Sequence, residues 1–195
     1  MSGSLAEYAV GITDKNGRHR YCTLFYDGAL AKYRHEPIEL LEIGIASGGS
    51  IVMWHRYFNN ARRIVGIDTN PSSALLDEYR QAVGTRAHNI SVKHGDAYSS
   101  EISENFGSFD IIIDDGPHTL DSHLACLTLY VPKIKPGGLL VIEDIPDVNW
   151  VEAYERIVNA QRGLTCKAID LRNEYKRLPD DLLFMVERHG PSLRP

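Results

Sequence analysis

Short apolar runs alternate with amphipathic stretches along the chain from about residue 38 onward. The runs are rich in Ile, Val and Leu, and polar residues rarely interrupt them. Strands that are buried on both faces, as in a parallel sheet, have this pattern. We therefore predict seven strands, at Glu39–Ile45, Arg63–Asp68, Ile90–Asp96, Phe109–Asp114, Gly138–Asp144, Thr165–Leu171 and Leu182–Glu187.

Helical spacing of apolar residues marks most of the stretches between these runs, at about residues 51–58, 75–83, 120–131 and 151–158. Strand and helix in alternation predict βαβ units. Residues 173–181, between the last two runs, are polar and lack this spacing, so we expect those two strands to pair antiparallel. The predicted fold is α/β, a doubly wound, seven-stranded, mostly parallel sheet with an antiparallel edge strand. The first 35 residues show no clean period.

Length and composition are those of one globular domain, with 195 residues of which 43% are hydrophobic and 24% charged. The net charge of -5 lacks the basic surface expected of a nucleic-acid binder. No apolar run approaches the roughly 20 residues of a membrane span. Cys22, Cys126 and Cys166 are far apart, which argues against a zinc site or a disulfide framework. We therefore expect a cytoplasmic protein that binds neither nucleic acid nor membrane.

A glycine-rich loop follows the first strand and precedes the first helix. Gly44 and Gly49 permit a tight turn and close approach of a ligand, and the helix start offers free N–H groups. The spacing also fits a relaxed dinucleotide fingerprint, or a plain strand-to-helix turn. Glu42 disfavours a phosphate and favours the ammonium group of an aminoacyl sulfonium ligand. The candidate cofactor-binding residues here are Glu42, Gly44, Ser47, Gly49 and Ser50.

Acidic residues also end the second and third predicted strands. Asp68 can accept hydrogen bonds from both ribose hydroxyls of a nucleoside cofactor, whether NAD or S-adenosylmethionine, or it can cap a helix. Asp96, followed by the small residue Ala97, can bind an adenine amino group. Ligands of such folds bind beyond the carboxyl ends of the strands. We therefore add Asp68, Asp96 and Ala97 to the cofactor-binding candidates.

The order of these motifs resembles the class I, Rossmann-like methyltransferase fold over roughly residues 38–188. The segments that carry the resemblance are LEIG with its glycines, VGID, GDA, FDIIIDD and GGLLVIED. The resemblance implies S-adenosylmethionine as cofactor. It also implies that the fourth and fifth strands are neighbours.

Four carboxylates end these two strands, and adjacent strands lie only about 4.8 Å apart. Such a cluster needs protons or a cation. Oxygen ligands select a hard ion, Mg²⁺ before Ca²⁺ or Mn²⁺. We predict Asp115, Glu143 and Asp144 as metal ligands, whereas Asp114 can face the sulfonium side of the cofactor site. The alternative is a set of helix caps and solvated acids.

His118 lies three residues beyond Asp115, at the rim of the proposed metal site. There it can take the proton of a substrate hydroxyl, and general base catalysis is typically worth about 10²–10⁴-fold. We predict His118 and Asp115 as catalytic residues. The alternative for His118 is a cap or a surface residue, and His123, on the following helix, is a weaker candidate.

The whole set resembles the metal-dependent macrocin and mycinamicin O-methyltransferases. Their Asp-Asp-Gly-x-His element and Glu-Asp pair are matched by Asp114, Asp115, Gly116, His118, Glu143 and Asp144. Their earlier Thr-Asp-Lys, His and Tyr segment is matched by Thr13, Asp14, Lys15, His19 and Tyr21, while Pro117 replaces the usual serine.

This resemblance implies methylation of a hydroxyl on a sugar, diol or catechol-like natural product, with Mg²⁺ or another hard divalent cation. It also implies a segment, residues 1–37, that packs over the active site of a methyltransferase domain at 38–195, and a possible homo-oligomer. The larger family members carry a further N-terminal domain.

Other functions remain as alternatives. The chain can bind S-adenosylmethionine as a pathway accessory protein or catalyse a different reaction with it. An NAD-linked oxidoreductase is disfavoured by Glu42 and by the acids of the fourth strand. A methyltransferase for protein or RNA is disfavoured by the acidic charge.

Overall fold

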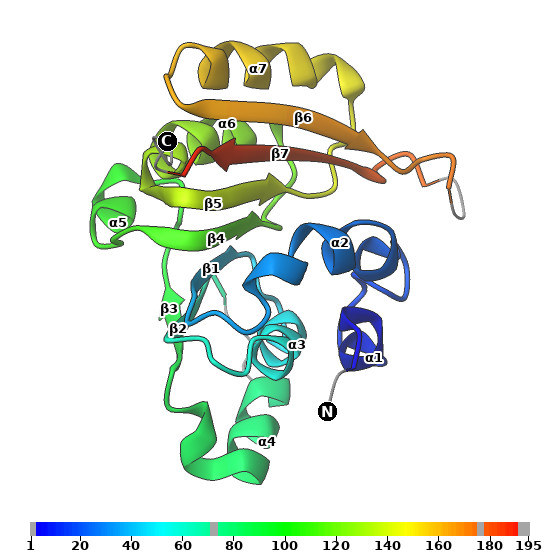
Figure 1. The fold of residues 1–195 in the computed structure, drawn as a ribbon, viewed down its shortest axis with the longest axis vertical. Coiled ribbons are helices and arrows are strands. Elements are labelled where there is room, and N and C mark those ends of the chain that lie inside the picture. Colours follow the sequence, from blue (N-terminus) through cyan, green and yellow to red (C-terminus); the bar gives the residue numbers. More distant parts are fainter. Residues whose placement is uncertain (1–2, 71–73, 175–177, 191–195) are drawn as a thin grey trace, which may run out of the picture. The chain divides into compact units, whose positions relative to one another are not determined.

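The computed structural model describes residues 3–70, 74–174 and 178–190. It divides into two compact units, an N-terminal unit, Met1–His94, and a C-terminal unit, Gly95–Pro195. The seven predicted strands are all present, in the order β3-β2-β1 within the N-terminal unit and β4-β5-β7-β6 within the C-terminal unit (Figure 1).

The N-terminal unit holds three parallel strands, β1 (Glu39–Ile43), β2 (Arg63–Asp68) and β3 (Ile90–His94). Two of the predicted helices follow them, α3 (Gly49–Tyr57) and α4 (Ala74–Val83), and η3 (Gly84–Ala87) extends the second. The strands β1 and β2 are buried along almost their whole length, as their unbroken apolar runs predict.

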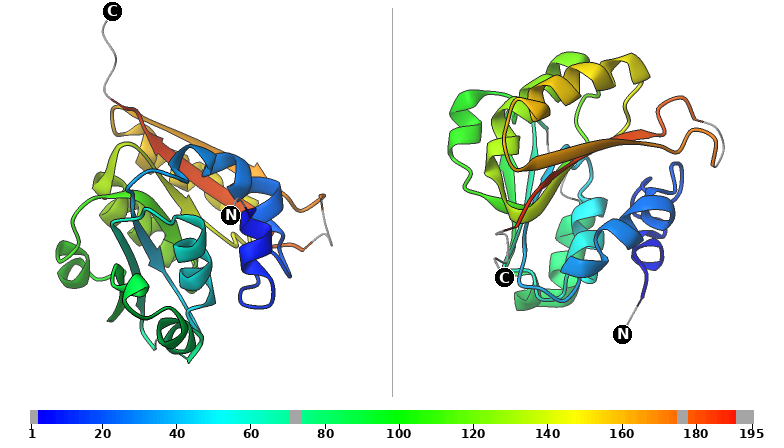
Figure 2. Two further views of the ribbon diagram at one scale, coloured as in Figure 1. Left: turned by 60° about the horizontal axis from the view of Figure 1, so that its bottom comes forward. Right: turned by 45° about the horizontal axis from the view of Figure 1, so that its top comes forward.

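Residues 3–38 contain short helical elements that the sequence did not predict. They are α1 (Leu5–Ala9), the π-helix η1 (Cys22–Tyr26), α2 (Asp27–Ala29) and η2 (Ala31–Tyr33). The helix α1 carries a capping box and packs against α3 (Figure 2). Elements this short present too few residues to establish a hydrophobic period.

The C-terminal unit holds the other four strands, β4 (Phe109–Asp114), β5 (Ile134–Ile142), β6 (Leu164–Asp170) and β7 (Leu182–Arg188). The strands β4 and β5 are parallel, whereas β7 runs antiparallel to both β5 and β6. The predicted antiparallel pairing at the edge is confirmed, with β6 as the outer strand. The fifth strand begins at Ile134 rather than at the predicted Gly138. The prediction missed its first residues because Pro136 and two glycines interrupt the apolar run.

The remaining two predicted helices are α6 (Leu120–Tyr130) and α7 (Val151–Asn159), and α7 lies along β6 (Figure 1). The short elements α5 (Ser100–Glu104), η4 (Val131–Lys133) and η5 (Val148–Trp150) complete this unit. Within the described ranges, the helices are all too short or too polar to cross a membrane.

Candidate active site

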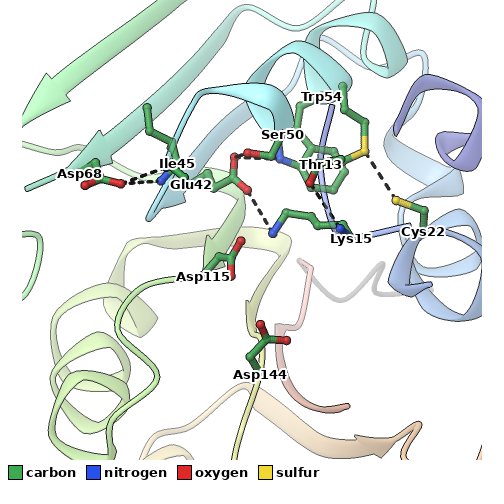
Figure 3. A network of polar contacts seen from close by, with 12 residues as sticks. Thr13, Lys15, Cys22, Glu42, Ile45, Ser50, Trp54, Asp68, Asp115 and Asp144 are labelled. Carbon is green, nitrogen blue, oxygen red and sulfur yellow. Dashed lines mark hydrogen bonds and ion pairs between the residues drawn. The ribbon is translucent and has the colours of Figure 1, made fainter. Parts of the chain in front are cut away.

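The glycine-rich loop is braced by Asp68. Its Oδ2 accepts the backbone N–H groups of Ile45, at 3.0 Å, and Ala46, at 3.1 Å (Figure 3). Ala46 has a left-handed backbone, with φ of +42°, which costs a non-glycine residue about 1–3 kcal/mol. The predicted ribose ligand Asp68 therefore also holds the turn beside it. Its Oδ1 accepts the N–H of Asn70 at 2.8 Å.

Glu42 is completely buried in β1 and is bound by side chains of the same unit (Figure 3). Its Oε2 accepts hydrogen bonds from Ser50 Oγ at 2.7 Å and Trp54 Nε1 at 3.1 Å. Lys15 Nζ, with a side chain 1% exposed, lies 3.4 Å from Oε1. An ammonium group does meet this carboxylate, as predicted for a ligand, but here it is the ammonium group of Lys15.

Gly49 allows the N-terminal segment to approach the first turn of α3. A Cβ atom on Gly49 would lie 1.6 Å from the carbonyl oxygen of Ile12. Packing within the unit therefore requires glycine at this position, independently of any cofactor. Gly44 turns the chain with φ of +79° and donates its N–H to Ile67 O at 2.8 Å, and Ser47 lies partly exposed on the loop.

In the C-terminal unit Asp114 is completely buried at the end of β4. Tyr98 Oη donates a hydrogen bond to its Oδ1 at 2.6 Å. Burial raises the pKa of Asp114 to about 6, partly opposed by hydrogen bonds from Tyr98 and the Cys126 thiol. A Cβ atom on Gly116 would lie 1.8 Å from Tyr98 Oη, which explains the glycine of the Asp-Asp-Gly element.

The adenine candidates Asp96 and Ala97 lie beside this tyrosine. Asp96 is exposed, and its Oδ1 accepts the backbone N–H of Tyr98 at 2.9 Å. Ala97 is buried, and its carbonyl accepts a hydrogen bond from Tyr130 Oη at 2.8 Å. Sequence reasoning missed Tyr98, because a single tyrosine in a loop carries no pattern.

Asp115, His118 and Asp144 form a cluster in the C-terminal unit. His118 Nε2 lies 3.8 Å from Asp115 Oδ1 and 3.8 Å from Asp144 Oδ2, and all three side chains are partly exposed. One potential ligand atom from each lies within 4.8 Å of the others. Glu143, the third predicted ligand, is buried and outside this group, and its N–H donates to Asp114 O at 2.9 Å.

The donor set of this cluster fits a hard divalent cation. Two carboxylates supply oxygen, the ligand type that Mg²⁺ prefers, and Mg²⁺ often takes only one or two carboxylates and keeps several waters. The partial exposure of Asp115 and Asp144 leaves room for waters or substrate oxygens. The structure thus brings together two of the three predicted ligands and the predicted base.

Two residues of the cluster have a strained backbone. His118 and Asp144 lie in the left-handed region, with φ of +53° and +51°. Each such non-glycine residue costs about 1–3 kcal/mol, and strain of this kind concentrates at functional sites. The imidazole thus reaches both carboxylates although Pro117 stands where the family has serine.

His123 lies on α6, as predicted, and is 1% exposed. Its Nδ1 is 2.7 Å from Tyr154 Oη, and its ring lies edge-on to those of Trp150 and His118. Burial, with a smaller contribution from positive charge on His118, lowers the pKa of His123 to about 4. Sequence reasoning missed Tyr154 because it belongs to the apolar stripe of α7.

A sequence model described as a methyltransferase domain matches residues 41–145, more than half of the chain, and spans the glycine loop and the acidic cluster. The chain belongs to this methyltransferase family.

Several curated relatives of this chain are named as O-methyltransferases. The chain is 33% identical over 141 residues to 8-demethyl-8-(2-methoxy-alpha-L-rhamnosyl)-tetracenomycin-C 3'-O-methyltransferase of Streptomyces olivaceus, covering 68% of this chain and 34% of the relative. It is 33% identical over 151 residues to mycinamicin VI 2''-O-methyltransferase of Micromonospora griseorubida, covering 71% and 35%. The resemblance seen in the sequence is confirmed, and the chain spans about a third of the length of these relatives.

Solved structures confirm the predicted fold of this chain. A methyltransferase of the mycinamycin biosynthetic pathway, in complex with Mg and SAH, matches with a TM-score of 0.74 and 24% identity, over 100% of this chain and 57% of that one. The O-methyltransferase of tomaymycin synthesis from Streptomyces achromogenes, in complex with SAM, matches with a TM-score of 0.63 and 18% identity, over 97% and 92%. The sheet is therefore of the Rossmann-like methyltransferase type.

Proposed function

We propose that this methyltransferase transfers a methyl group from S-adenosylmethionine to a hydroxyl group of a small molecule, with a sugar of a glycosylated natural product as the favoured acceptor. The observation that carries the proposal is the His118 imidazole between two partly exposed carboxylates, in a chain of the methyltransferase family. The names of relatives support the sugar: one specifies a rhamnosyl group, and a further relative, 30% identical over 146 residues, is L-olivosyl-oleandolide 3-O-methyltransferase of Streptomyces antibioticus.

The proposed donor site uses the residues predicted at the strand ends. Asp68 and Asp96 each retain lone pairs beyond their bonds to backbone N–H groups, and these can accept ribose hydroxyls and an adenine amino group. Glu42 and Ser50 are both buried and are hydrogen-bonded to each other, so they support the loop from the protein interior. The full proposed set is Glu42, Gly44, Ser47, Gly49, Ser50, Asp68, Asp96, Ala97 and Asp114.

Asp115 and Asp144 are the proposed holders of Mg²⁺, with Glu143 as the third predicted ligand. A divalent ion at such a site orients substrate oxygens and lowers the pKa of a hydroxyl. His118 Nε2 accepts the hydroxyl proton. The oxygen then bonds to the methyl carbon, while the carbon–sulfur bond breaks and leaves its electron pair on sulfur. The Asp115 carboxylate, 3.8 Å from Nε2, stabilises the imidazolium that forms.

The N-terminal segment, residues 1–37, is proposed to cover the donor loop of the methyltransferase domain at 38–195. The contact between Ile12 and Gly49 and the ion pair between Lys15 and Glu42 support this. Three free cysteines, two of them buried, support the proposed cytoplasmic location. Self-association is proposed only from the family resemblance.

The test is methyl transfer to rhamnosyl and olivosyl acceptors, with and without EDTA, for the wild type, His118→Gln and His189→Gln. The exposed His189 serves as the matched control. We expect EDTA to abolish turnover and His118→Gln to reduce kcat by about 10²–10⁴-fold. Full activity in EDTA would overturn the metal role, and full activity of His118→Gln would overturn the base. Binding of S-adenosylhomocysteine without any methylated product would instead indicate an accessory protein, and preferential binding of NADH an oxidoreductase.

A further inference from the structure

A second imidazole lies directly behind the proposed base. The ring centroids of His118 and His123 are 6.4 Å apart, with an angle of 65° between their planes. Both rings belong to the C-terminal unit, and His123 is 1% exposed. The proposed reaction does not use His123.

Each of the two rings has one buried nitrogen that lacks a hydrogen-bond partner in the described part of the chain, His118 Nδ1 and His123 Nε2. Leaving a buried polar atom unsatisfied is expensive, so such atoms usually bond to each other or to an ordered water. With bonds of about 2.9 Å, one water can bridge nitrogen atoms up to about 6 Å apart. The centroid separation of 6.4 Å is too long for a direct hydrogen bond between the two nitrogens but permits a bond through one water.

The other nitrogen of each ring is already committed. His118 Nε2 faces Asp115 and Asp144, where the proposed reaction delivers a proton. His123 Nδ1 is bound to Tyr154 Oη at 2.7 Å, and Tyr154 packs on Phe184 of β7. The hydrogen bond to Tyr154 thus holds the His123 ring in place, and Nε2 is the nitrogen that remains for a further hydrogen bond.

We propose that His123 is a positioning residue: its Nε2 accepts a hydrogen bond from a buried water that itself accepts from His118 Nδ1–H, and so keeps His118 Nε2 as the nitrogen that receives the substrate proton. A neutral imidazole carries its proton on one nitrogen only, so holding it at Nδ1 leaves a lone pair at Nε2. The low pKa of His123, about 4, keeps this ring neutral and able to accept. This inference rests on the proposed role of His118 as base.

The kinetic test compares His123→Phe and His123→Gln. Loss of a group that orients a reacting residue typically costs about 10–100-fold in activity. We expect His123→Phe to lower kcat by that factor, with KM for the acceptor unchanged, and His123→Gln to recover much of the loss because its amide oxygen accepts a hydrogen bond. The matched control is His55→Phe, which removes a histidine with the same 2.7 Å contact to a tyrosine, Tyr79, in the N-terminal unit.

A spectroscopic test separates this inference from the proposed function. Ring ¹⁵N shifts of His118, recorded at alkaline pH without substrate, report which nitrogen carries the proton. We expect Nδ1–H in the wild type and a mixture of both forms in His123→Phe. A wild type already protonated at Nε2, or no change in His123→Phe, would overturn the inference and leave the methyltransferase proposal standing. Full activity of His118→Gln would instead overturn the proposed base, and absence of any methylated product would overturn the proposed methyl transfer.

Discussion

The contact between Gly49 and the Ile12 carbonyl predicts a large effect for Gly49→Ala. The added Cβ atom would lie 1.6 Å from Ile12 O and 2.7 Å from Ile12 C, whereas real Cβ atoms almost never come within 3.0 Å of such atoms. The carbonyl must therefore retreat by at least about 1.4 Å. Because the obstacle is backbone, no side-chain rotation relieves it.

Overpacking of this kind costs typically about 1–3 kcal/mol. For a chain of this length, 1 kcal/mol shifts Tm by about 2–4 °C, so we expect Gly49→Ala to lower Tm by about 2–12 °C. The retreat of Ile12 also strains the nearby ion pair between Lys15 and Glu42. We therefore expect the N-terminal segment of the variant to be cleaved faster in limited proteolysis.

Calorimetry and proteolysis of Gly49→Ala are compared with Gly28→Ala. Gly28 is exposed on a helical turn, and a Cβ atom there would meet nothing within 4 Å. Alanine at a helical position is favourable by about 0.5–1 kcal/mol, so this control should lose no stability. If Gly49→Ala has the same Tm and the same rate of proteolytic cleavage as Gly28→Ala, the N-terminal segment does not approach α3 as closely as the structure places it.

Three further changes test the same structure. Glu42→Gln removes the carboxylate charge beside Lys15, and breaking a buried pair from one side costs up to about 3–5 kcal/mol of folding free energy. Urea unfolding should show this loss of stability. The double variant with Lys15→Met should lose less stability than the two single variants together. Asp144→Gly should be about 1 kcal/mol more stable than Asp144→Asn, because glycine relieves the left-handed backbone. Both variants should bind Mg²⁺ more weakly in calorimetry. Equal stability of the two variants would show that the backbone at Asp144 is not strained. The pKa of His123 is lowered to about 4 from its usual 6.5. Its contribution to stability, about 3 kcal/mol, is therefore present above pH 6.5 and is lost as the pH falls to 4. The free energy of unfolding of His123→Gln, measured at several pH values, should not show this loss.

The strands could be predicted because parallel strands buried on both faces give unbroken apolar runs. The first, third and fifth strands end two residues earlier than predicted, so Asp144 follows β5 rather than belonging to it. The predicted clustering of Asp115 and Asp144 with His118 is nevertheless present. The short helical elements of residues 3–38 could not be predicted, because one or two turns contain too few residues to show a hydrophobic period.

The partners of buried carboxylates were also beyond the sequence. Glu42 at a strand end indicated a cation, but not that Lys15, 27 positions earlier, supplies one. Tyr98 and Tyr154 bind Asp114 and His123 through single hydroxyl groups. Such contacts depend on how distant segments pack, which local residue patterns do not encode.

The close approach at Gly49 also bears on which cofactors the first helix can receive. Dinucleotide-binding enzymes offer the positive end of this helix to a diphosphate. Here that end already faces a protein oxygen with partial negative charge, from Ile12. A diphosphate arriving there would be repelled and would have to displace the segment, whereas a sulfonium donor carries no phosphate and has a single carboxylate as its only anionic group.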